Sequence, residues 1–194
     1  MSSTENDSLM AMSASGDQSS ENKPLGFVCS TCGQWHAGLP LDWAFNSPIY
    51  WGEIPERERF KRGFLNSDFC KIDGREFFIR GVIAIPIINS QELFMWGVWA
   101  KLSQAHFDRM VELWDDPKII EEPPYLGWLS NNVPIYPSTL NLKLRLHSKD
   151  VKDRPFFEIE QTEHPLAVEQ RIGITQERIE QIAALMTHGG KDGA

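Results

Sequence analysis

Long apolar runs and targeting signals are absent from this chain of 194 residues. The longest apolar stretch runs only from Val82 to Ile88 and contains Pro86, whereas a membrane-spanning helix needs about 20 apolar residues. The first seven residues, Met1 to Asp7, lack the basic start and the apolar core of a secretory signal. The sequence therefore predicts a cytoplasmic protein with no membrane partner.

A basic excess is also absent, because the formal net charge is -8 at pH 7. Nucleic-acid binding generally needs clustered Lys and Arg to contact phosphates. The one local candidate, Arg57 to Arg62, has Glu58 interleaved, which is typical of a solvated helix face. We therefore expect no nucleic-acid partner, and the acidic charge suits a protein that repels RNA or attracts a basic protein partner.

Cysteines are few, and the common catalytic motifs are missing. The three cysteines are an odd number, and a cytoplasmic setting keeps thiols reduced, so a disulfide framework is not expected. The chain has no Gly-rich phosphate loop, no Gly-x-Ser-x-Gly elbow and no His-Glu-x2-His helix. Any Cys pair is thus interpreted as a metal or redox element.

Composition divides the chain into three parts. Residues 1–23 are dominated by Ser, Asp, Glu and Asn, a composition that cannot offset the entropy of ordering, so we predict a disordered tail. Residues 24–188 have the apolar content of one globular domain. Residues 189–194 are predicted to be a disordered C-terminus.

The clearest secondary-structure signals lie in the middle of the domain. Two runs rich in Ile, Val, Phe and Trp, at 77–87 and 93–102, predict a β-hairpin. Ser103 then caps a predicted helix whose apolar residues recur at i, i+3, i+4 and i+7 from Phe107. Trp96 and Trp99 have odd spacing, so they point to opposite faces of their strand and one of them needs cover from a helix or a partner.

The flanking segments complete the predicted fold. A short helix is expected between Pro55 and Gly63, and a terminal helix is expected to follow Thr175. Leu140 to His147 alternates as a strand with one wet face, and residues 157–160 are its expected neighbour. The Pro-rich segment 39–55 is interpreted as an ordered loop packed by aromatic rings. The prediction is an α+β fold, with an antiparallel sheet, a central hairpin and helices on one face.

The candidate site is the N-terminal knuckle Cys29-Ser-Thr-Cys32-Gly33. A turn of this type aims both sulfurs at one point, and the small residue after the second Cys lets backbone N–H groups approach the thiolates. Two sulfurs are half of a zinc site. We expect His36 and Cys70 to complete a structural Cys3His zinc site, with His147 and His164 as reserve ligands.

Three other interpretations of the knuckle stay open. A thioredoxin-like redox pair would open a helix, but the residues after Gly33 are not helical in pattern. The two thiols could instead pack without a metal. In the third interpretation one Cys is a nucleophile paired with His, although nothing in the sequence marks one thiol as activated.

The remaining titratable residues give weaker signals. His106 and His188 lie near predicted helix ends and are expected on the surface. His164 precedes Pro165 and is either a base or a loop His that hydrogen-bonds backbone. Four carboxylates in the irregular region would support acid-base hydrolysis if two of them met in a cleft. They are Glu53, Asp42, Asp68 and Asp73.

The order of motifs resembles the bacterial family known as domain of unknown function 2199. The resemblance runs from about Phe27 to Met186, and each of its motifs is short. The motifs are Cys29-x2-Cys32-Gly33 with His36, Asp68-x-Cys70, Phe77-Phe-Ile-Arg80-Gly81, Trp96-Gly-Val-Trp99, Tyr125-Leu-Gly127, Pro134-Ile-Tyr136-Pro137 and His164-Pro-Leu-Ala167-x-Glu169-Gln170-x2-Gly173. The resemblance implies a bacterial cytosolic protein and brings no catalytic residue.

Two functional hypotheses follow. The first is a non-enzymatic binding or regulatory module that contains a structural zinc knuckle and neutralises a protein partner, as immunity proteins do. The second is a metal- or thiol-dependent enzyme built around Cys29, Cys32, His36 and Cys70, which requires an open coordination position or a reactive thiol.

Overall fold

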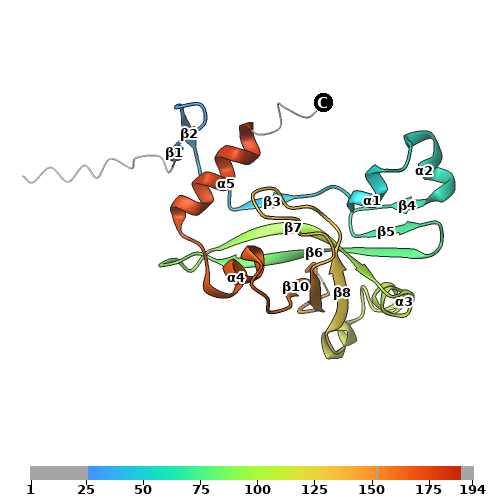
Figure 1. Ribbon diagram of the computed structural model, residues 1–194. Helices are drawn as coiled ribbons and strands as arrows, with labels where there is room; N and C mark the ends of the chain where they lie inside the picture. Colours follow the sequence, from blue (N-terminus) through green and yellow to red (C-terminus); the bar gives the residue numbers. More distant parts are fainter. Residues whose placement is uncertain (1–25, 152, 189–194) are drawn as a thin grey trace, which may run out of the picture.

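The computed structural model describes residues 26–151 and 153–188, so the tails predicted at 1–23 and 189–194 lie outside the described residues. Figure 1 shows a β-barrel with helices around it and a small hairpin beside the last helix. The strands are β1 (Gly26–Val28), β2 (Trp35–Ala37), β3 (Asp42–Ala44), β4 (Gly63–Leu65), β5 (Phe69–Ile72), β6 (Glu76–Pro86), β7 (Leu93–Leu102), β8 (Tyr125–Leu129), β9 (Lys143–His147) and β10 (Phe156–Ile159). The helices are α1 (Ile49–Gly52), α2 (Glu56–Arg62), α3 (Gln104–Glu112), a 3-10 turn at Pro117–Glu121, α4 (Pro165–Ile172) and α5 (Gln176–His188).

The predicted hairpin is present as β6 and β7, which pair antiparallel from Phe77↔Leu102 to Pro86↔Leu93. The sheet around it differs from the expected one, because β6, β7, β8, β9 and β10 close into a five-stranded barrel. The closing contact is the parallel pairing of β10 with β6 at Phe156↔Val82. Gly81 permits it, since a Cβ there would lie 2.4 Å from the Phe157 ring.

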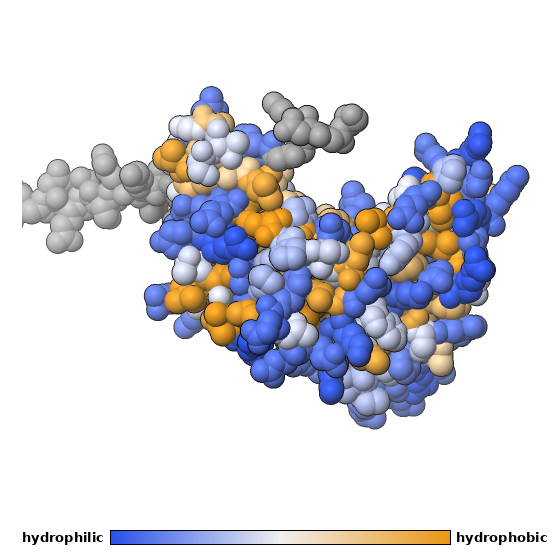
Figure 2. Space-filling model, in the orientation of Figure 1, coloured by the Kyte–Doolittle hydropathy of each residue, from blue (hydrophilic) through white to orange (hydrophobic). Residues whose placement is uncertain are grey.

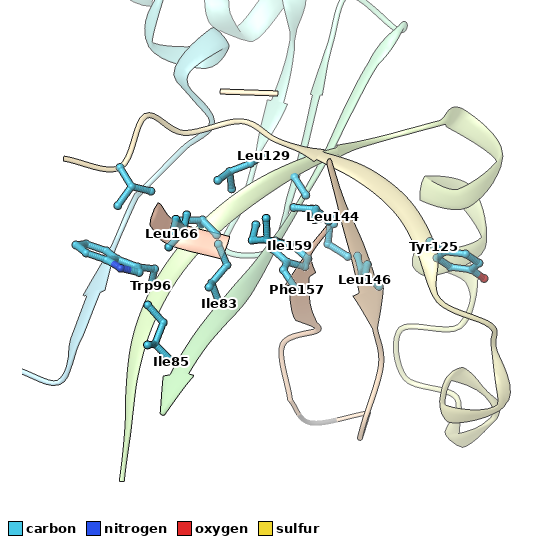
Figure 3. Close-up of a cluster of buried hydrophobic side chains, with 14 of the residues drawn as sticks. Ile83, Ile85, Trp96, Tyr125, Leu129, Leu144, Leu146, Phe157, Ile159 and Leu166 are labelled. Atoms are coloured by element: carbon cyan, nitrogen blue, oxygen red, sulfur yellow. The ribbon is translucent and has the colours of Figure 1, made fainter. Parts of the chain in front are cut away.

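The barrel interior forms the main core. Alternate residues of each strand point inward and are buried, as the period of two requires. Figure 3 shows this cluster, to which α4 contributes Leu166. Its labelled members are Ile83, Ile85, Trp96, Tyr125, Leu129, Leu144, Leu146, Phe157, Ile159 and Leu166.

A second core lies on the other side of β7. Trp96 and Trp99 are both fully buried, Trp96 in the main core and Trp99 in a separate cluster with Trp51 and Ile54. Segment 39–55 supplies this cover, and Trp99 Nε1 donates a hydrogen bond of 3.0 Å to the Phe45 carbonyl. The aromatic loop is thus ordered as expected, although it also contains β3 and α1.

Two predicted helix starts are confirmed by their caps. Ser103 Oγ accepts a hydrogen bond from His106 N at 3.2 Å before α3, and Thr175 Oγ1 accepts one from Arg178 N at 3.3 Å before α5. In the part of the chain that the structure describes, no helix has the length and apolar character needed to cross a membrane.

Candidate metal centre

The knuckle is a tight turn closed by backbone hydrogen bonds. Cys29 N donates to Gln34 O and Gly33 N donates to Cys29 O, both at 2.9 Å. Gly33 has a φ of 69°, a left-handed conformation that glycine adopts without steric cost. The turn places Cys29 in the protein interior and leaves Cys32 exposed. It also lets Thr31 N approach Cys29 Sγ at 3.4 Å.

His36 reaches the knuckle from the opposite strand of the small hairpin. The antiparallel register of β1 and β2 pairs it with Phe27, and their rings stack with centroids 5.4 Å apart. His36 Nε2 lies 3.3 Å from Cys32 Sγ. The hairpin register therefore sets the position of the imidazole relative to the thiol.

His188, the last residue of α5, is the fourth member of the group. Phe27 and Cys29 form a buried cluster with Ala183 and Ala184 of α5, so the hairpin covers the end of this helix. The His36 and His188 rings meet edge to face at 5.5 Å. His188 Nε2 is buried without a hydrogen-bond partner among the described residues.

These four side chains are placed so that together they could hold a metal ion. Cys29, Cys32, His36 and His188 each offer one ligand atom, and these atoms all lie within 4.8 Å of one another. Tetrahedral zinc with ordinary bond lengths separates a sulfur from a nitrogen ligand by about 3.5 Å, close to the 3.3 Å between Cys32 and His36. A buried imidazole nitrogen without a partner is costly, and a metal bond would satisfy it. The donor set fits a metal ion coordinated by two cysteines and two histidines.

Hydrogen bonding favours the thiolate of Cys29. Burial raises the pKa of this thiol, but hydrogen bonds from Cys32 and Thr31, made by both backbone and side-chain groups, lower it further than burial raises it. The net result is a Cys29 pKa below the ordinary value. A thiolate is the form of cysteine that binds metal, so the turn favours the form of Cys29 that a metal ion would need.

The fourth expected ligand, Cys70, does not join this group. It lies on β5 between Leu65 of β4 and Phe78 of β6, and it packs with Trp51 and Trp99 in the second core. Its side chain is 0% exposed, and burial raises the pKa of its thiol to about 12. The position that we expected Cys70 to take is occupied by His188.

The expectation that His188 is a surface residue was wrong. It rested on the position of His188 at a helix end, where side chains usually meet solvent. In the structure the β1–β2 hairpin covers this end of α5, so the imidazole is half-buried. The signal that sequence reasoning lacked is spatial, since 151 positions separate His36 from His188.

Neither reserve histidine lies in the metal group, and both have other partners. His164 caps α4: its Nδ1 accepts from Leu166 N at 3.2 Å, and its Nε2 lies 3.3 Å from the Pro137 carbonyl oxygen. Both ring nitrogens are thus used by backbone, as the backbone-bonding interpretation expected. His147 Nε2 lies 2.9 Å from Glu158 Oε2 on the barrel surface.

Two of the four candidate carboxylates are held by arginines. Asp73 pairs with Arg62 at 2.6 Å, and hydrogen bonds from Arg62 lower the pKa of this carboxyl despite some desolvation. Asp68 pairs with Arg154 at 2.8 Å. Burial raises the Asp68 pKa, but Ser67 and Arg154 lower it by more. Carboxylates held ionised in this way are poor general acids.

The sequence was compared with known proteins. The model of a family described as "Uncharacterized protein conserved in bacteria", domain of unknown function 2199, matches residues 28–174. The chain belongs to this family. Searches of curated proteins and of solved structures give no match to this chain.

Three motif residues of this chain tie its elements together. Gln170 of α4 accepts from Ile159 N at 2.8 Å and donates to Phe157 O at 2.7 Å, so one side chain bridges two backbone groups of β10. Tyr136 donates to Glu169, whose other oxygen accepts from Arg178 of α5 at 2.9 Å. All three serve the packing of α4 and α5 on the barrel.

Proposed function

We propose that this protein is a non-enzymatic binding module whose N-terminal hairpin is fixed to its last helix by a structural zinc ion. The observation that carries the proposal is the convergence of Cys29, Cys32, His36 and His188. Zinc is the ion that such an S2N2 set favours. The β1–β2 hairpin forms a sheet of its own and pairs with no barrel strand, so a metal bond would strengthen its attachment.

Four protein ligands favour a structural role over a catalytic one. Catalytic zinc sites keep one position for water or substrate, whereas structural sites are closed by four side chains. The bound ion would hold its four ligands in place, and its positive charge would offset the negative charge of the two thiolates. The hairpin would then present the Val28 and Trp35 pair, which is 65% and 48% exposed on its outer side. Exposed aromatic and aliphatic side chains of this kind support a protein-binding role.

Metal analysis of variants tests this proposal. We expect protein purified without added metal to hold about one zinc per chain. His188→Ala and Cys29→Ser should each lower the zinc affinity at least about a hundred-fold, because each removes one of four ligands. Cys70→Ala is the matched control and should retain the metal. Wild-type protein without stoichiometric metal, or loss of metal only in the Cys70 variant, would contradict the proposal.

A second candidate function is thiol chemistry, which the Cys32–His36 contact of 3.3 Å favours. Cys32 is exposed, and an imidazole beside a thiol is the arrangement that activates cysteine nucleophiles. Thiol titration of protein from which a chelator has removed any metal distinguishes the two functions. An enzyme would show a Cys32 that reacts much faster than a free thiol and depends on His36, whereas a zinc ligand would show ordinary reactivity after chelation.

A further inference from the structure

A row of cations follows the outer side of β9. Leu144 and Leu146 point into the barrel core and are buried, while Lys143 and Arg145 alternate with them and are exposed. Lys149 continues the row beyond the strand, with its Nζ 5.0 Å from the centroid of the Phe156 ring. We call Lys143, Arg145 and Lys149 the cationic strip.

The strip gathers three cations that have no ion pair among the described residues. Lys143, Arg145 and Lys149 form no salt bridge with any described residue, and Glu158, which lies opposite Arg145 in the strand register, pairs with His147 instead. Many other cations are neutralised by a carboxylate within 4.0 Å. Those in salt bridges are Arg57, Arg62, Arg75, Lys101, Arg109, Arg154 and Arg178.

Apolar side chains lie beside the strip. The register places Leu126 opposite Arg145 and Trp128 opposite Lys143, and Leu126 is 43% exposed. On the other side, a hollow of about 470 Å³ lies between β10 and α4. Its apolar lining comes from Phe156, Ile159 and Ala167, and Arg145 and Arg171 also line it. In Figure 2 the surface around β8 mixes hydrophilic with a few hydrophobic residues.

We propose that the outer face of β8, β9 and β10 binds an acidic, extended segment of a partner protein. The strip would pair with carboxylates on one side of that segment, and Leu126, Trp128 and the hollow would receive its apolar side chains. This inference rests on the binding role proposed above and names the partner's chemistry. It does not need the metal ion.

Charge complementarity at contact distance selects the acidic partner. The net charge of -8 acts at long range, but salt screens it beyond about 8 Å at physiological ionic strength, so the unpaired cations dominate the contact itself. A polypeptide fits better than a nucleic acid, because it can place carboxylates on the strip and uncharged side chains beside Glu158 and Glu160, which line the same hollow. A phosphate backbone carries a negative charge at every unit and would be repelled there. Alternating side chains of an extended segment also match the period of a strand surface.

Fluorescence anisotropy with a defined peptide tests the inference. The probe is a labelled peptide of about twelve residues in which glutamate alternates with leucine, long enough to run along β9 past the whole cationic strip. We expect the full chain to bind it, with an affinity that falls as salt rises, and a peptide with glutamine in place of glutamate to bind at least about ten-fold more weakly. The double variant K143E/R145E should lose at least about ten-fold in affinity.

A second charge reversal provides the matched control. R57E/K61E on α2 makes the same change in net charge on another surface, and it should leave the peptide affinity within about two-fold of wild type. Equal loss in both double variants would assign the effect to the overall field and overturn the proposal. So would failure of the wild type to bind the peptide, or tighter binding of an oligothymidylate of equal length. Zinc content measured on each variant reports the metal centre separately, so failure of one proposal is not mistaken for failure of the other.

Discussion

At the scale of single residues, the three cysteines should differ in reactivity because they differ in environment. Cys32 is exposed in the knuckle, Cys29 is buried beside it, and Cys70 is enclosed by aromatic rings in the second core. Burial blocks the access of a reagent to Cys70. It also raises the pKa of the Cys70 thiol to about 12, so little of the reactive thiolate forms. Cys70 is therefore a core residue rather than a site residue.

Alkylation kinetics should reproduce this order. In chelated, native protein we expect iodoacetamide to modify Cys32 first and Cys29 more slowly, while Cys70 reacts only after unfolding in denaturant, when its thiol becomes accessible. Peptide mass spectrometry at timed intervals assigns each modification. Modification of Cys70 in native protein at the rate of Cys32 would show that the second core opens readily, contrary to the packing described.

Sequence reasoning identified three of the four residues that converge, and it failed on the fourth for a physical reason. Cys29, Cys32 and His36 lie within eight consecutive positions, so local turn geometry brings them together whatever the rest of the chain does. His188 arrives through the docking of α5, which depends on Phe27 packing against Ala183 and Ala184. A contact between distant helices and hairpins has no local pattern in one sequence.

At the scale of elements, α4 is held to the barrel through Gln170. Its side-chain amide bonds two backbone groups of β10, and Gln170→Ala would leave both without their partner. We expect this variant to lose about 1–3 kcal/mol of stability, measured by urea denaturation. The control Gln161→Ala changes the same residue type at an exposed position in the neighbouring turn and should change stability by less than about 0.5 kcal/mol. Equal effects would contradict the bridging role.

The same elements show what the sequence could predict. β6, β7, β9 and β10 have the residue alternation or apolar runs of strands, and the structure contains all four. No strand was predicted at β8 and no helix at α4, because in each case the prolines beside the element dominated the local signal. Barrel closure was missed because it depends on the close approach of Gly81 to Phe157, which is a tertiary contact.

At the scale of the whole molecule, the proposed metal centre and the barrel would be separate sources of order. The core clusters of the barrel do not include Cys29 or His188. Removal of the proposed zinc ion with a chelator should therefore leave the barrel folded and loosen the hairpin and the end of α5. We expect amide exchange in β1, β2 and the last turn of α5 to accelerate at least about ten-fold, which corresponds to about 1.4 kcal/mol.

Hydrogen exchange followed by mass spectrometry measures this difference by segment. Peptides from β6 and β7 serve as the internal control, and their exchange should stay within about two-fold of that in the untreated protein. Global unfolding on chelation would mean that the metal supports the whole fold. No change anywhere would mean that the hairpin holds α5 through apolar packing alone.

The position of His188 also has a consequence for biosynthesis. Three of the proposed ligands leave the ribosome early, but the fourth emerges only after every strand of the barrel has been made, so all four could hold an ion only after translation has passed residue 188. An ion held by all four side chains then closes a loop of about 150 residues. Cross-links that close long loops lower the conformational entropy of the unfolded chain most. Zinc binding would thus distinguish complete chains from truncated ones. A product truncated within α5 would lack the fourth ligand, and its thiols would stay accessible to the cell's degradation machinery.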